Sequence, residues 1–184
     1  ENTTFTSIAG TLTSAFLHEE LSPVICETIA SRAFQFSPEI KQIDENLFLL
    51  ELNKGPTGSQ KDFGVSFLIN TLETYFQWKG GNAVFCDVTT GHLGAMISKL
   101  LKGKKYLKAV LIYPKGTVKS LSEEDFIWNG GNILPIEFDG TEEDCHKIVR
   151  EIFSNKDFVK QNRLTVANTA NIGRLLPQAY FYPY

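Results

Sequence analysis

Lys61 stands at the end of a loop rich in glycine and proline and directly before a predicted helix. The stretch from Leu50 to Gly64 reads L-E-L-N-K-G-P-T-G-S-Q-K-D-F-G, so an apolar run leads into this loop. The segment 55–58 (Gly-Pro-Thr-Gly) specifies backbone geometry more closely than a surface lysine requires. A helix N-terminus disfavours the ammonium form, and a neutral lysine can form a Schiff base with a carbonyl compound. From the residues alone, the alternative is an ordinary solvated lysine.

Two further clusters combine groups that bind anions. The first, Thr89-Thr90-Gly91-His92-Leu93-Gly94, follows a short apolar run and opens a predicted helix, where backbone amides favour anionic ligands. The second, Asn168-Thr169-Ala170-Asn171-Ile172-Gly173-Arg174, offers amides, a hydroxyl and a guanidinium suited to phosphate or carboxylate. A structural turn in the first case, and an N-cap with a solvated arginine in the second, are the alternatives. The first lacks the G-x-G-x-x-G pattern, which disfavours a Rossmann-like nucleotide binder.

Helices and strands must position these candidate residues, and the first elements of the chain are predicted to be helices. Apolar spacing predicts helices over residues 4–18 and from Pro23 to about residue 36, with Ser22 as N-cap and Ser37-Pro38 as the stop. Residues 46–52 read as a strand. Asp62 is a plausible N-cap for a helix that reaches about residue 78 and ends at 79–81.

Beyond residue 80, short apolar runs alternate with amphipathic segments. Strands are expected at 83–86, 107–113, 133–138 and 164–166, and helices at 94–101, 121–128, 141–153 and after 168, with a break at 129–131. This alternation predicts an α/β fold in which a parallel sheet carries helices on both faces. We expect a helical segment at 1–45 and an α/β domain at 46–184 that carries Lys61.

Composition and charge narrow the class of protein. A hydrophobic content of 42%, a charged content of 21% and a net charge of −3 indicate a soluble globule without a nucleic-acid or membrane partner. No apolar run approaches the ~20 residues of a membrane span. Three distant cysteines and three histidines show no metal-ligand spacing, so we expect no metal site and a reducing, cytoplasmic location. The start at Glu1 and the aromatic run 179–184, which should bury itself, suggest a fragment.

Several blocks in the same order resemble the threonine synthase family of pyridoxal-phosphate enzymes, which have the tryptophan-synthase-β fold (fold type II). The most specific is Glu51-Leu52-Asn53-Lys54-Gly55-Pro56-Thr57 with Lys61-Asp62-Phe63-Gly64. The resemblance covers nearly the whole chain. The other blocks are 5–36, 88–94, 112–116 (Ile-Tyr-Pro-Lys-Gly), 130–133 (Gly-Gly-Asn-Ile) and 168–178.

The resemblance implies a role for each candidate residue. Lys61 would hold pyridoxal phosphate as an internal aldimine, and His92 would lie near the phenolic oxygen of the cofactor. Thr89, Thr90 and Gly91 would receive the substrate carboxylate. Asn168, Thr169 and Arg174 would meet the phosphate of O-phosphohomoserine. The implied enzyme is a carbon–oxygen lyase of threonine biosynthesis, a monomer or homodimer, which forms threonine and phosphate from O-phosphohomoserine and water.

The chain also departs from the family pattern. Ser59-Gln60 replaces an apolar–aromatic pair, Asn53-Lys54 replaces Phe-His, and His92-Leu93 replaces Asp-Thr in the substrate turn. The family's second half, with its glycine loop for the cofactor phosphate, is absent, so we expect these 184 residues alone to be inactive. Two alternatives therefore stay open: a related elimination enzyme with an altered substrate, and a truncated or degenerate homologue without activity.

Overall fold

The computed structural model describes residues 4–117 and 131–184. The chain forms two compact units: Glu1–Thr74 with Ile172–Tyr184, here called the helical unit, and Tyr75–Asn171, here called the sheet unit. This division differs from the expected boundary at residue 45. The reason is that the C-terminal aromatic segment joins the N-terminal helices in one core, together with the first part of the helix that begins at Lys61.

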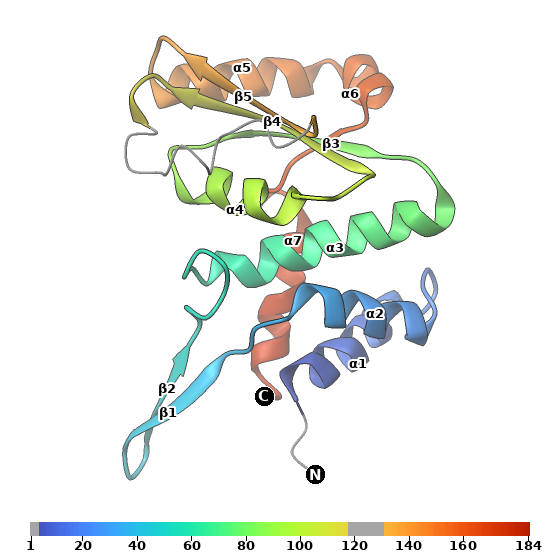
Figure 1. The fold of residues 1–184 in the computed structure, drawn as a ribbon, viewed down its shortest axis with the longest axis vertical. Coiled ribbons are helices and arrows are strands. Elements are labelled where there is room, and N and C mark those ends of the chain that lie inside the picture. The colour runs from blue at the N-terminus through green and yellow to red at the C-terminus, as the bar shows by residue number, and fades with distance from the viewer. Residues whose placement is uncertain (1–3, 118–130) are drawn as a thin grey trace. The chain divides into compact units, whose positions relative to one another are not determined.

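Besides the short helix α7 (Ile172–Leu175), four helical elements of the described residues build the helical unit (Figure 1). They are α1 (Phe5–Leu17), α2 (Pro23–Ala33), the part of α3 (Lys61–Lys79) up to Thr74, and the 3-10 helix η3 (Leu176–Phe181). Thr4 caps α1 by accepting a hydrogen bond from the Ser7 amide, and Pro23 occupies the first turn of α2, where a missing N–H costs nothing. The predicted helices at both positions are confirmed.

Aromatic side chains fill the core of the helical unit. The Phe63 ring meets those of Phe5 and Phe36 edge to face, with centroid distances of 5.6 Å and 4.8 Å. Tyr180 is fully buried and its hydroxyl pairs with Thr13 Oγ1 at 2.9 Å. Burial raises the pKa of Tyr180 to about 12, so the hydroxyl stays protonated in that pair. The expectation that the aromatic run 179–184 buries itself is confirmed for Tyr180, whereas Tyr182 is 92% exposed.

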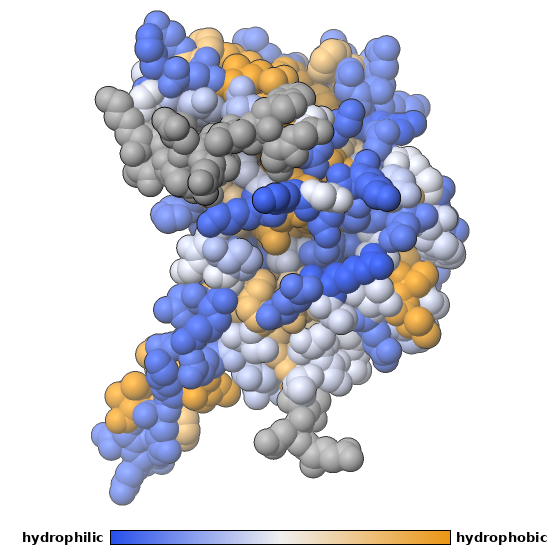
Figure 2. Space-filling model, in the orientation of Figure 1, coloured by the Kyte–Doolittle hydropathy of each residue, from blue (hydrophilic) through white to orange (hydrophobic). Residues whose placement is uncertain are grey.

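A two-stranded hairpin precedes the Lys61 loop. Strand β1 (Glu39–Asp44) pairs antiparallel with β2 (Leu47–Glu51), which is the strand predicted at 46–52. Strand β1 was not predicted. The hairpin projects from the helices of its unit (Figure 1), and Figure 2 shows apolar residues on its surface. These are Ile40, Ile43, Leu47, Phe48 and Leu49.

The sheet unit contains a four-stranded parallel sheet in the order β5-β4-β3-β6. Its strands are β3 (Ala83–Val88), β4 (Leu107–Pro114), β5 (Ile133–Phe138) and β6 (Leu164–Thr165). Helix α4 (His92–Leu101) covers one face and α5 (Glu142–Ser154) the other (Figure 1). The predicted parallel sheet with helices on both faces is confirmed. Helix α6 (Lys156–Asn162) was not predicted, and the expected helix at 121–128 lies outside the described residues.

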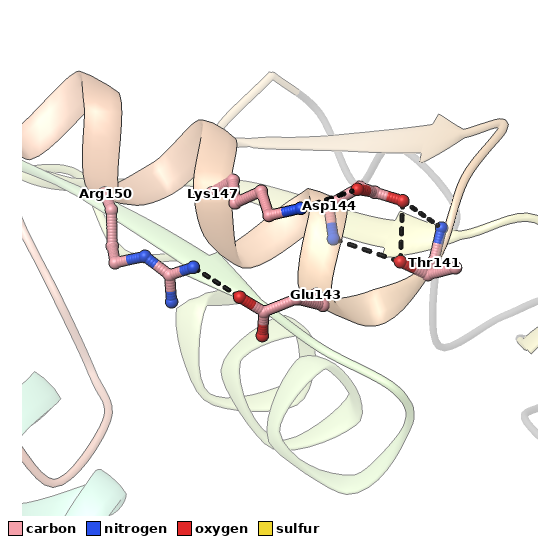
Figure 3. A network of polar contacts seen from close by, with 5 residues as sticks. All are labelled: Thr141, Glu143, Asp144, Lys147 and Arg150. Carbon is pink, nitrogen blue, oxygen red and sulfur yellow. Dashed lines mark hydrogen bonds and ion pairs between the residues drawn. The ribbon is translucent and has the colours of Figure 1, made fainter.

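Helix α5 begins with a capping box (Figure 3). The Asp144 amide donates to Thr141 Oγ1, and the Asp144 carboxylate accepts from the Thr141 amide and hydroxyl. Further along the helix, Lys147 pairs with Asp144, and Arg150 pairs with Glu143. This network satisfies amides that a helix start leaves without intrahelical partners.

Asp144 should make the stability of α5 depend on pH. Hydrogen bonds from Thr141, and then Lys147, hold the pKa of its carboxyl below the ordinary value. Because the folded pKa is lowered, the contribution is present above the unfolded pKa of about 3.9 and is lost as the pH falls through the folded pKa. Asp144→Asn should therefore unfold at a lower urea concentration than wild type at pH 7, and this gap should shrink below about pH 4.

Urea midpoints followed by circular dichroism at several pH values measure this gap. Asp157→Asn is the matched control, because it removes a carboxylate from the first turn of α6, where Asn155 provides the cap. A gap for Asp144→Asn that stays constant down to pH 3, about one unit below the ordinary carboxyl pKa, would contradict the assignment.

Candidate active site

Lys61 is the first residue of α3, and its side chain is exposed. The loop before it contains a turn in which the Gly58 amide donates to the Gly55 carbonyl oxygen at 3.1 Å. The Lys61 amide itself donates to Ser59 Oγ at 3.2 Å. The structure therefore confirms that Lys61 stands where an ordered loop enters a helix, with its amine accessible from solvent.

The buried Asp62 side chain holds this loop in place through hydrogen bonds. It is fully buried, and its Oδ2 accepts hydrogen bonds from the amides of Thr57 at 2.9 Å and Ser59 at 3.2 Å, while Oδ1 accepts from the Thr57 hydroxyl at 2.8 Å. The prediction that Asp62 is the N-cap is wrong, because the helix begins one residue earlier and the carboxylate reaches back to the loop. A Cβ at Gly55 would come within 2.5 Å of Asp62 Oδ2, so this close approach requires glycine.

Removal of the Asp62 carboxylate should loosen the loop that holds Lys61. Asp62→Ala leaves two amides without their acceptor, and we expect it to lower the free energy of unfolding by about 2–4 kcal/mol. Asp62→Asn should cost less, since its oxygen can still accept from both amides and its nitrogen can donate to the Thr57 hydroxyl. Equilibrium urea unfolding measures both. Equal losses for the two variants would show that the carboxylate contributes through charge alone.

Arg174 lies beside the same helix. It belongs to the short helix α7 (Ile172–Leu175), whose backbone packs against Gly64, one turn of α3 after Lys61. A Cβ at Gly64 would reach Arg174 Cγ at 3.0 Å and the Arg174 carbonyl oxygen more closely still. Glycine is needed at position 64 for this approach, and it brings Arg174 and Lys61, distant in sequence, into one region of the helical unit.

The turn at 89–94 lies at the carboxyl end of β3 in the sheet unit. The Thr89 hydroxyl is buried and accepts hydrogen bonds from the amides of Gly91 at 3.1 Å and Gly94 at 2.9 Å. It therefore shapes the turn from within. Thr90 is exposed, and the exposed His92 is the first residue of α4. Of these residues, Thr90 and His92 present their side chains to solvent.

The turn at 168–171 follows β6, the strand next to β3. Asn168 is half-buried: its Nδ2 donates to Asp87 Oδ1 at 3.1 Å, and its Oδ1 accepts from the Ala170 amide at 2.9 Å. Thr169 is exposed. Because β3 and β6 are neighbouring parallel strands, the two predicted anion-binding turns lie at the same edge of the sheet.

Asp87 joins the two strand ends, and the sequence interpretation missed it. Its carboxylate is 1% exposed and also accepts from the Ala167 amide at 2.7 Å. Burial, and then the charge of Asp87, raise the pKa of the neighbouring Cys86 thiol to about 11, so this cysteine stays protonated. A signal was present: Asp87 is the one charged residue in the apolar strand 83–88.

The predicted site residues thus form two groups. Lys61 and Arg174 belong to the helical unit, whereas Thr89, Thr90, Gly91, His92, Asn168 and Thr169 belong to the sheet unit. In residues 4–117 and 131–184, no three His, Cys, Asp or Glu side chains gather as metal ligands. Over the same ranges, no helix combines the length and apolar character of a membrane span. All three cysteines are buried and free.

Threonine synthases are similar to this chain in both sequence and structure. The relative from Buchnera aphidicola of Schizaphis graminum is 33% identical over 92% of this chain and 39% of its own length. The Escherichia coli threonine synthase is 31% identical, and its crystal structure matches with a TM-score of 0.79 over 97% of this chain and 41% of that chain. A threonine synthase from Brucella melitensis, solved with PLP bound, matches over 98% of this chain and 40% of its own with a TM-score of 0.86; at 23% identity it supports the fold alone.

The resemblance seen in the motifs is therefore confirmed, although no family profile matches the chain. The chain spans about two fifths of the length of the curated relatives it matches, which is consistent with an N-terminal portion.

Proposed function

We propose that this protein, a relative of threonine synthases, is a pyridoxal-phosphate enzyme that converts O-phosphohomoserine and water to threonine and phosphate. The observation that carries the proposal is Lys61, an exposed lysine at the start of α3 on a loop that the buried Asp62 holds in place. Similarity to threonine synthases along nearly the whole chain supports it. Because the chain spans about two fifths of those relatives, the activity is proposed for the complete protein.

The local structure fits a cofactor anchored on Lys61. To react with an aldehyde cofactor, a lysine must be accessible from solvent and its backbone must be held in a fixed position. Lys61 is exposed, and its amide is held by a hydrogen bond to Ser59 Oγ. When bound, pyridoxal phosphate supplies an electron sink for charge that develops on substrate carbon. We propose that, within this chain, Lys61 and His92 bind the cofactor.

The remaining residues bind substrate and move protons. The Lys61 amine, when not holding the cofactor, is suited to take and return protons at substrate carbons. The turn formed by Thr89, Thr90 and Gly91 is proposed to receive the substrate carboxylate, with the exposed Thr90 hydroxyl as the donor, because the Gly91 amide already donates to Thr89 Oγ1. Asn168, Thr169 and Arg174 are proposed to bind the phosphate, since amides, hydroxyls and guanidinium groups all donate to phosphate oxygens.

The wider setting of the protein is also part of this proposal. The substrate is a small molecule, and the free cysteines are consistent with a reducing cytoplasm. We propose a monomer or homodimer that acts without nucleic acid or membrane partners.

A related elimination enzyme with another substrate is the second candidate. His92 and Leu93 stand where the family pattern has Asp and Thr, so a carboxylate and a hydroxyl are replaced by an imidazole and an apolar group. Turnover of O-phosphohomoserine compared with other O-phosphorylated and O-acylated amino acids separates the two candidates. Threonine formation as the fastest reaction supports the first, and a faster reaction with another substrate supports the second.

Borohydride reduction tests the proposal directly. The protein is incubated with pyridoxal phosphate, reduced and digested, and the peptides are analysed by mass spectrometry. We expect a pyridoxyl group on Lys61 and none after Lys61→Arg, which keeps the charge at that position. A label confined to other lysines, or no label, would overturn the proposal and favour a homologue without activity.

A further inference from the structure

Asp87 is a buried carboxylate to which the proposed function assigns no role in binding cofactor or substrate. It is the last residue but one of the apolar strand β3, is 1% exposed, and connects the ends of two strands through hydrogen bonds to residues about 80 positions later. Buried carboxylates are costly unless several donors compensate them. We therefore expect the role of Asp87 to lie in the groups that it binds.

The side chain held by Asp87 is the amide of Asn168. A carboxylate only accepts, so the Asn168 nitrogen must face Asp87, and the oxygen then faces the Ala170 amide, from which it accepts at 2.9 Å. The flipped amide would place oxygen against oxygen on one side and nitrogen against an N–H on the other. Only one orientation is compatible with both neighbours, and it leaves the second N–H of the Asn168 amide as a donor.

We infer that Asp87 is a positioning residue that fixes the Asn168 amide, so that its second N–H is presented to the phosphate of the substrate. That Asn168 binds the substrate phosphate is part of the proposed function, and the inference rests on it. The hydrogen bond from the Ala167 amide to Asp87 at 2.7 Å fixes the start of the same turn. Asp87 acts through Asn168 and does not itself touch the substrate, because it is buried.

Asp87 has two opposing effects on phosphate binding, and the larger of them decides whether KM rises or falls in Asp87→Asn. Its negative charge repels a phosphate, whereas its hydrogen bond orients a donor toward that phosphate. In Asp87→Asn, the new amide oxygen can accept from the Ala167 amide, but the new nitrogen then faces the Asn168 nitrogen, and Asn168 must rotate. If orientation dominates, KM for O-phosphohomoserine should rise about tenfold with a smaller change in kcat, as for the loss of one charge-assisted hydrogen bond. A fall in KM would overturn the inference.

A double variant separates positioning from simple support of the fold. Asp87→Asn combined with Asn168→Asp re-creates all three hydrogen bonds: the new amide accepts from Ala167 and donates to the new carboxylate, which accepts from Ala170. Thermal stability should return toward wild type. KM should stay high, because the donor that faces the phosphate is gone. Restoration of KM together with stability would show that Asp87 only supports the fold.

A readout without turnover completes the experiment. In ¹⁵N NMR spectra, added inorganic phosphate should shift the Asn168 side-chain amide of wild type and leave that amide unshifted in Asp87→Asn; the double variant has no side-chain amide at position 168. Cys86→Ala is the matched control, since it alters the same buried strand without contacting Asn168, and its phosphate response should equal that of wild type. Failure of Lys61 to take the pyridoxyl label would count against the proposed function. A labelled Lys61 with unchanged KM and phosphate response in Asp87→Asn would count against Asp87 alone.

Discussion

Lys61→Ala should lower threonine formation by at least about 10³-fold, since the variant loses both the anchor for the cofactor and the amine that moves protons. The fold should persist, because the Lys61 side chain is exposed and the loop is held by Asp62. Steady-state kinetics and the visible absorbance of bound cofactor measure the loss. Small primary amines added to the variant should restore part of the rate, since they can enter the space vacated by the side chain and accept the proton.

Two comparisons make this result specific. Lys61→Arg keeps a positive charge but cannot attach the cofactor, so it should be as inactive as Lys61→Ala. Lys79→Ala removes an exposed lysine at the other end of the same helix and should retain wild-type activity. Activity of Lys61→Arg near that of wild type would refute a covalent role for Lys61.

Phe63→Ala should lower the free energy of unfolding by about 3–5 kcal/mol, the usual cost of removing a buried aromatic ring. Phe63 is 1% exposed and packs against Phe5, Phe36 and Phe181, with ring centroids 4.8 to 5.6 Å away. The cavity left by the ring cannot be filled by side chains from one element alone. Urea titrations followed by circular dichroism give the loss.

An exposed phenylalanine of the same unit provides the control. Phe16→Ala removes a ring that is 49% exposed on α1, and it should change stability by no more than about 0.5 kcal/mol. Phe63→Leu should fall between the two, because it keeps much of the apolar volume. Equal effects of Phe63→Ala and Phe16→Ala would mean that the aromatic cluster does not stabilise the helical unit.

Phe63 also connects stability to the candidate site. It lies between Asp62, which holds the loop, and Gly64, against which the Arg174 backbone packs. The three residues after Lys61 therefore have distinct tasks: one orders the loop, one anchors the helix in the core and one admits α7. We expect changes at any of them to reach Lys61 through the backbone.

Local pattern was sufficient for most elements that carry candidate residues. The helix that begins near Lys61, the parallel strands and the turn at 89–94 all follow from apolar spacing and from glycine and proline signals, with boundaries that shift by a residue or two, as for Asp62. The helix expected after residue 168 begins only at Ile172. Strand β1 was missed because its charged and polar residues, exposed throughout, give no apolar alternation.

The sequence by itself determined most of the helices and strands, apart from β1 and α6, and that a helix begins near Lys61, because these depend on neighbours within a few residues. Only the tertiary structure decided the tasks of the buried acids. Asp62 turns back to Thr57 and Ser59, and Asp87 meets Ala167 and Asn168 across two strands that are adjacent in the sheet but far apart in the chain. A buried carboxylate is stable only beside its donors, and no local pattern shows which distant donors the fold will supply.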